Sequence, residues 1–153
     1  MTPKFFFRAV LFLGILFTFL SSAVAAEFLS VKNKSLILFE GPSASTKKKF
    51  IVTEGYPLKV IVSLKDWKKV KDHLGKISWA QVKALDSERT VITLKSQVTI
   101  YNKPNKSEAK LAYIDKLVVL NLLSPIVTDG WIKVKSISVG VQGFIRAEEV
   151  WGI

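Results

Sequence analysis

Gly130-Trp131-Ile132-Lys133-Val134-Lys135 repeats, with changes, an earlier segment of the chain, Asp66-Trp67-Lys68-Lys69-Val70-Lys71. Side chains alternate between the two faces of a strand, so both segments place an apolar residue inward and lysine outward on a half-buried antiparallel sheet. The pair Asp129-Gly130 signals a tight turn before the second segment, because glycine adopts positive φ without strain. Both segments are therefore predicted to be strands.

Short runs rich in Val, Ile and Leu recur through the rest of the chain, separated by turn residues. After residue 26, no stretch keeps the spacing of an amphipathic helix for three turns. The clearest runs cover residues 36–39, 58–62, 91–94, 98–101, 117–123 and 131–134. This pattern predicts an all-β protein.

The order of these segments occurs twice. Trp67 is followed 12 residues later by Trp79, and Trp131 is followed 13 residues later by Phe144. With no Gly/Ser-rich linker between them, two tandem copies of about 60 residues are the economical interpretation. We place them at residues 27–86 and 87–153, and expect them to pack together because such small domains have little core.

The two copies resemble the bacterial SH3-like (Src homology 3, SH3b) domain family of exported proteins. The resemblance rests on Gly41-Pro42-Ser43, on the Asp-Trp-x-x-Val and Gly-Trp-x-x-Val strands, and on the Gly-x-x-Gly-aromatic-aliphatic pattern of residues 140–145. Ser78 and Lys103 depart from it, each standing where the family usually has glycine. The resemblance implies two tandem small SH3-like β-barrels and a binding role at the cell envelope.

The N-terminus has the pattern of a secretory signal. Positive side chains precede an apolar run over residues 9–20, and small residues in an Ala-x-Ala pattern follow. Residues 1–26 are therefore predicted to be a signal peptide, cleaved before Ala26 or Glu27. The run is shorter than the roughly 20 residues that span a bilayer, although an uncleaved anchor is the alternative if the preceding phenylalanines extend it. We expect a periplasmic or secreted protein without a stable membrane anchor after cleavage.

Composition narrows the chemistry. The 153 residues include no Cys and one His, so disulfides, thiol chemistry and multi-histidine metal sites are excluded, and no cofactor or metal is expected. The formal charge of +11 is carried mainly by lysine, which attracts anions diffusely and lacks the fork geometry by which arginine reads bases. Together with export, this makes nucleic acid an unexpected partner.

Four aromatic residues are candidates for a ligand groove: Tyr56, Trp67, Tyr101 and Trp131. Aromatic side chains supply large contact areas at low entropic cost. The alternative is that the tryptophans belong to the core and that the tyrosines only direct their hydroxyls to water.

Five lysines are candidates for an anion-facing surface: Lys47, Lys48, Lys49, Lys68 and Lys69. They would face an anionic wall polymer, lipid headgroup or acidic protein. The alternative is an ordinary solvated face, because lysine is depleted at interface cores.

No set of catalytic residues stands out. The adjacent pair Asp72-His73 is predicted to lie on a loop, and Glu148-Glu149 is predicted to be an exposed pair near a turn. We therefore expect a non-enzymatic binding or scaffold protein whose ligand is a cell-wall polymer or an envelope protein. The alternative is a structural accessory subunit that uses no groove. The oligomeric state stays open.

Overall fold

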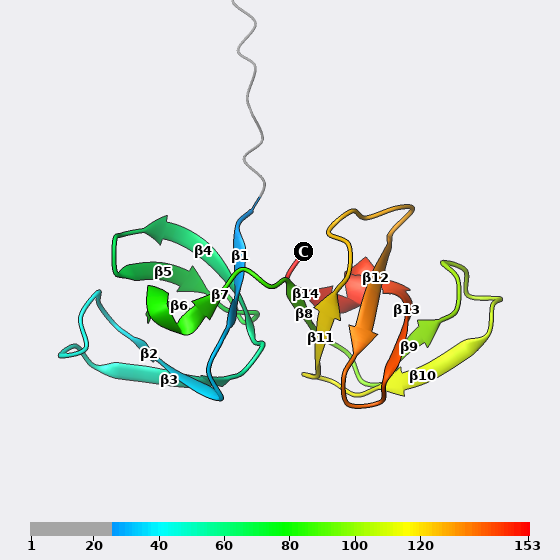
Figure 1. Cartoon of the computed structure of the whole chain (residues 1–153), viewed down its shortest axis with the longest axis horizontal. Coiled ribbons are helices and arrows are strands. Elements are labelled where there is room, and N and C mark those ends of the chain that lie inside the picture. Colours follow the sequence, from blue (N-terminus) through cyan, green and yellow to red (C-terminus); the bar gives the residue numbers. More distant parts are fainter. Residues whose placement is uncertain (1–25) are drawn as a thin grey trace, which may run out of the picture.

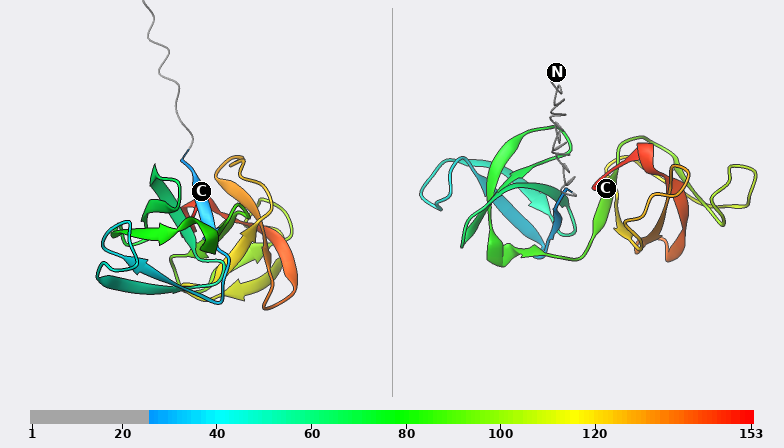
Figure 2. Two further views of the ribbon diagram at one scale, coloured as in Figure 1. Left: turned by 60° about the vertical axis from the view of Figure 1, so that its left-hand side comes forward. Right: turned by 90° about the horizontal axis from the view of Figure 1, so that it is seen from above.

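The computed structural model describes residues 26–153, so the predicted signal peptide lies outside the described residues except for Ala26. The described chain consists of short antiparallel strands, turns and two single-turn 3-10 helices, and the all-β prediction is confirmed. Figures 1 and 2 show two lobes side by side, with the last strand of the first lobe leading directly into the second.

The first lobe is one seven-stranded sheet with the order β3-β2-β6-β5-β4-β1-β7. Its strands are β1 (Phe28–Val31), β2 (Ser35–Phe39), β3 (Lys48–Thr53), β4 (Pro57–Ser63), β5 (Trp67–Lys71), β6 (Ile77–Gln81) and β7 (Leu85–Asp86). A 3-10 helix, Val82–Ala84, connects β6 to β7.

The second lobe repeats this arrangement, with the order β10-β9-β13-β12-β11-β8-β14. Its strands are β8 (Thr90–Thr93), β9 (Val98–Tyr101), β10 (Lys110–Ile114), β11 (Val119–Leu122), β12 (Trp131–Ser136), β13 (Val141–Arg146) and β14 (Val150–Trp151). The 3-10 helix Ala147–Glu149 stands where Val82–Ala84 stands in the first lobe.

Each sheet bends around a small apolar core of its own. In the first lobe Leu38, Leu58 and Val70, from β2, β4 and β5, are fully buried in one cluster. Ile100 and Ile132, from β9 and β12, are buried in the corresponding cluster of the second lobe. One sheet thus supplies both walls of its own core, as strand alternation in a strongly curved sheet allows.

The closed barrels expected from the family resemblance are not formed. In each lobe the hydrogen-bonded order has two ends, β3 and β7 in the first and β10 and β14 in the second. The end strands cannot complete a barrel, because β7 and β14 have only two residues each and β3 has no fully buried residue. The hairpins β2–β3 and β9–β10 extend toward opposite outer ends of the molecule (Figure 1).

The two lobes contact each other through their first and last strands. The rings of Phe28 and Trp151 meet edge to face at 5.4 Å, and the Arg89 guanidinium lies 5.5 Å from the Phe28 ring centre. The Thr90 hydroxyl donates a 2.6 Å hydrogen bond to the carbonyl of Gly55. Phe28 is buried as a result, so each small core gains apolar cover from its neighbour.

Among residues 26–153, no helix combines the length and apolar character needed to cross a membrane.

Gly55 is required by this interface for two reasons. Its φ is +74°, and a Cβ atom would lie 2.9 Å from Cγ1 of Val119 in the other lobe. Gly75 has a similar φ of +79° but an added Cβ would meet no atom within 4 Å. The two glycines therefore separate the cost of backbone strain from the cost of crowding between the lobes.

We expect Gly75→Ala to lower the free energy of unfolding by about 1 kcal/mol through strain alone. Gly55→Ala adds crowding against Val119, which costs about 1–3 kcal/mol more. Urea denaturation of both variants measures the difference. Equal losses would mean that Val119 moves aside freely and that the lobes are loosely packed.

Candidate functional site

A cleft of about 410 Å³ borders Trp67, where β5 begins. Trp67 pairs with Gln81 of β6, and the Val82 amide donates a 3.0 Å hydrogen bond to the Asp66 carbonyl. These pairings bring the loop before β5 against the start of the 3-10 helix. The cleft, called the Trp67 cleft below, is lined by Lys65, Asp66, Trp67, Gln81, Val82 and Lys83.

The indole of Trp67 packs against an aromatic ring of a neighbouring strand. The Phe39 ring of β2 meets it edge to face, with ring centres 5.5 Å apart and planes at 88°. Trp67 stays half-buried and borders the cleft, while Lys65, Asp66 and Lys83 around it are exposed. The first lobe therefore presents a fixed aromatic surface beside charged side chains.

The second lobe has the same aromatic pair, but its tryptophan is almost fully buried at the base of a cleft of about 360 Å³ that Ile126 and Phe144 also line. Tyr101 meets Trp131 edge to face, also at 5.5 Å and 88°. The Arg146 guanidinium lies 5.1 Å from the Trp131 ring centre, and Trp131 is only 7% exposed. Arg146 pairs with Trp131 as Gln81 pairs with Trp67, so an arginine of the chain itself covers the second tryptophan.

Gly130 makes room for this arginine. A Cβ atom at Gly130 would lie 2.7 Å from Nη2 of Arg146, so a side chain there would displace the guanidinium. The predicted turn is confirmed, since Asp129 and Gly130 have φ values of 51° and 78°. Arg146 is held there by donating a 3.0 Å hydrogen bond from Nη1 to the Asp129 carbonyl and by a 3.8 Å ion pair with Glu148.

The four predicted groove aromatics do not form a single groove. Tyr101 and Trp131 lie together beneath Arg146, and Trp67 lies in the other lobe. Tyr56 lies apart from all three, in a shallow groove of about 220 Å³ that also contains Ile92 of the second lobe. Of the four, Trp67 is the one that borders the cleft described above.

Tyr56 forms a hydrogen bond between its hydroxyl and Nδ1 of His73. Burial raises the pKa of the Tyr56 hydroxyl above its usual value of 10.0; the charge of Asp72 raises it further, and a hydrogen bond involving the His73 backbone offsets part of the rise. Asp72 itself is 8% exposed and accepts hydrogen bonds from the amides of Leu74 and Lys76. Its carboxylate therefore stabilises the turn and is not presented to a substrate.

The predicted lysines have different surroundings. Lys47, Lys48 and Lys49 are exposed, with Lys48 and Lys49 opening β3, and Lys49 donates a 3.0 Å hydrogen bond to the Ile77 carbonyl. Lys69, on β5, is half-buried.

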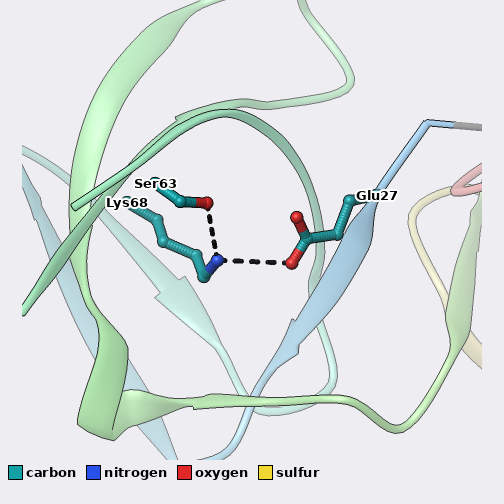
Figure 3. A network of polar contacts seen from close by, with 3 residues as sticks. All are labelled: Glu27, Ser63 and Lys68. Carbon is teal, nitrogen blue, oxygen red and sulfur yellow. Dashed lines mark hydrogen bonds and ion pairs between the residues drawn. The ribbon is translucent and has the colours of Figure 1, made fainter. Parts of the chain in front are cut away.

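Lys68 is engaged within its own lobe. Its Nζ lies 2.8 Å from the Ser63 hydroxyl and 3.3 Å from a carboxylate oxygen of Glu27 (Figure 3). The side chain is 16% exposed, and its ammonium group is already paired with Glu27. An outside anion would have to compete with that pair.

A second cleft, of about 470 Å³, lies between the lobes. Glu54, Asp86 and Glu88 line it with Lys32, and Glu88 accepts a 3.0 Å hydrogen bond from the Asn121 amide. That hydrogen bond lies within residues 87–153, but Gly55 of the first lobe and Val119 of the second both line the cleft, so it belongs to the interface between the lobes. Within residues 26–153 no three His, Cys, Asp or Glu side chains gather as metal ligands would.

Sequence reasoning had not singled out Gln81 or Lys83 of the Trp67 cleft, and Lys65 was only one of many lysines. An alignment of the two copies could have identified these residues, because Gln81 corresponds to Arg146 and Lys83 to Glu148. The intervals from tryptophan differ by one residue between the copies, which hid the correspondence until the strand pairings aligned it.

No protein family model matches the sequence, and neither does any curated protein. Similar solved structures include NlpC2 from Trichomonas vaginalis, with 13% identity, a TM-score of 0.37 and 84% of this chain covered. They also include NlpC1 from the same organism, with 13% identity, a TM-score of 0.39 and 87% of this chain covered. The chain spans about half the length of each, 49% and 48% respectively. TM-scores this low leave the ligand and activity of the chain open.

The raised pKa of Tyr56 makes its contribution to stability fall at high pH. The unfolded Tyr56 ionises near its usual pKa of 10.0, whereas the folded one keeps its proton to higher pH, so unfolding releases a proton in that window. The contribution of Tyr56 to stability is therefore fully present below about pH 10 and declines above it.

We expect Tyr56→Phe to flatten this decline, measured by urea denaturation between about pH 8 and about pH 11. Tyr113→Phe is the control, because Tyr113 is 63% exposed. A decline in Tyr56→Phe as steep as in the unaltered protein would contradict the assignment.

Proposed function

We propose that the protein is a non-enzymatic, exported SH3-like binding or scaffold protein of the bacterial cell envelope, and that the Trp67 cleft is its ligand site. The observation that carries the proposal is the difference between the lobes at one aligned position. Both tryptophans border a cleft, but Trp131 is 7% exposed and lies beneath Arg146, whereas Trp67 is half-buried and shares its cleft with two exposed lysines. A surface that one copy covers and the other leaves open fits a binding role for the open copy.

The size and lining of the cleft support a small ligand group. Its volume of about 410 Å³ is within the range of small-molecule sites, which combine an aromatic or apolar wall with a few polar groups. A protein partner of standard size would instead need about 800 Å² of surface on each side. These dimensions favour a segment of cell-wall polymer, with an envelope protein as the second possibility.

The positive net charge of the first lobe favours an anionic component of the envelope as the ligand. Residues 27–86 carry 12 basic and 6 acidic side chains, an excess of +6, against 9 and 6, an excess of +3, in residues 87–153. The lobe with the open tryptophan thus has twice the excess positive charge. Long-range attraction to an anionic surface would be strongest at that lobe.

The second lobe fits a structural role. Arg146 closes its tryptophan, and its last strand supplies Trp151 to the contact with Phe28. A purely structural accessory subunit remains the second candidate function, favoured by the covered state of Trp131. In that case the Trp67 cleft would bind nothing.

Filling the cleft from within tests the proposal. The double variant Asp66→Gly/Gln81→Arg copies the arrangement of Gly130 and Arg146 and is expected to cover Trp67. We expect cosedimentation with a crude bacterial envelope fraction to fall at least about tenfold, because the aromatic face is lost to the ligand.

The variant is more positive than the unaltered protein, so charge alone would strengthen its binding to an anionic envelope. Gln142→Arg is the control, because it adds a positive charge at an exposed position of β13. Circular dichroism confirms that the variants fold. Undiminished sedimentation of the double variant would remove the cleft as the binding site and leave the structural role.

A further inference from the structure

We propose that the Trp67 cleft recognises a carboxylate, and that the ligand is a free carboxyl group of the peptide part of the cell-wall polymer. This ligand class rests on the binding function proposed above. It is inferred from charges that are reversed between the two lobes at the positions surrounding the tryptophan.

In the second lobe a cation, Arg146, is held by a frame of two residues, through the carboxylate of Glu148 and the backbone carbonyl of Asp129. Glu148 forms a 3.8 Å ion pair with Arg146, and Asp129 contributes the carbonyl that accepts from Arg146 at 3.0 Å. The guanidinium lies over Trp131 between these two residues. In the second lobe the group bound by the frame is thus a cation, the guanidinium of Arg146 from the same chain.

In the first lobe both frame positions are basic. Strand pairing and the matched turn hydrogen bonds place Lys65 where Asp129 stands and Lys83 where Glu148 stands. The central arginine is replaced by the neutral Gln81. Lys83 thus replaces the carboxylate that pairs with the cation, Lys65 adds a second positive charge, and the cation itself is missing, so the complementary occupant is an anion.

The lysines are available for such an occupant. Lys65 and Lys83 are exposed and line the cleft, and neither takes part in a salt bridge or a side-chain hydrogen bond within residues 26–153. The Gln81 side chain adds a neutral amide that donates hydrogen bonds. A carboxylate between two ammonium groups beside an indole would gain charge-assisted hydrogen bonds and would keep the apolar part of its chain on the ring.

Removing the charge of Asp66 should have opposite effects on the binding of an anionic and a cationic ligand. Its carboxylate also lines the cleft and opposes an anion, while Gly130 at the equivalent place carries no charge. Asp66→Asn should therefore tighten the binding of a carboxylate ligand and weaken the binding of a cationic one. The same substitution thus distinguishes two opposite ligand classes.

The experiment compares purified sacculi before and after carbodiimide-driven amidation, which converts their carboxyl groups to neutral amides. We expect binding of the full mature protein to fall about five- to tenfold on amidation and to weaken with added salt. Lys65→Gln/Lys83→Gln should lose a similar factor on untreated sacculi and nothing further on amidated ones. Lys106→Gln/Lys116→Gln, at exposed positions of the second lobe, is the matched control and should bind as the unaltered protein does.

The outcomes separate this inference from the proposed function. Equal binding to native and amidated sacculi, or weaker binding by Asp66→Asn, would overturn the carboxylate. Binding to the crude envelope that Asp66→Gly/Gln81→Arg abolishes, without any binding to purified sacculi, would overturn the wall ligand in favour of an envelope protein. Neither result would contradict the proposal that the Trp67 cleft is the ligand site. That proposal is contradicted only if Asp66→Gly/Gln81→Arg still binds the envelope fraction.

Discussion

Burial of a few aliphatic side chains inside a single curved sheet is the interaction on which the rest of the structure depends. Each lobe has fewer than 70 residues, so its core is near the lower limit for independent stability. The sheet meets this limit by bending until β2, β4 and β5 place Leu38, Leu58 and Val70 in one cluster. The same bending brings the start of β5 against the end of β6, where the Trp67 cleft forms.

The contact between the lobes buries further apolar surface. Phe28 and Trp151 come from the first and last strands of the described chain, and their edge-to-face contact covers both sheets at the point where they meet. The close approach at Gly55 leaves no room for a side chain facing Val119. The lobe that contains the Trp67 cleft therefore packs against the second lobe. A site on a rigid framework loses less conformational entropy when a ligand binds.

The two lobes share one strand order but present different surfaces beside their tryptophans. The aromatic pairs Phe39–Trp67 and Tyr101–Trp131 have the same spacing and angle, 5.5 Å and 88°. The lobes differ at the position facing the indole, Gln81 or Arg146, and at the residue before the tryptophan, Asp66 or Gly130. Changes at such positions alter the surface without touching the buried clusters.

The sequence by itself determined the strand class, the twofold repeat, and the turn at Asp129-Gly130, because alternation and glycine chemistry act over a few neighbouring residues. It did not identify the edge strands β3 and β10, whose mostly exposed side chains lack a clear inward face. It named Trp67 and Trp131 as equivalent candidates. Only the tertiary structure distinguished them, because the cover over Trp131 comes from Arg146, a residue 15 positions away that strand pairing brings across the indole.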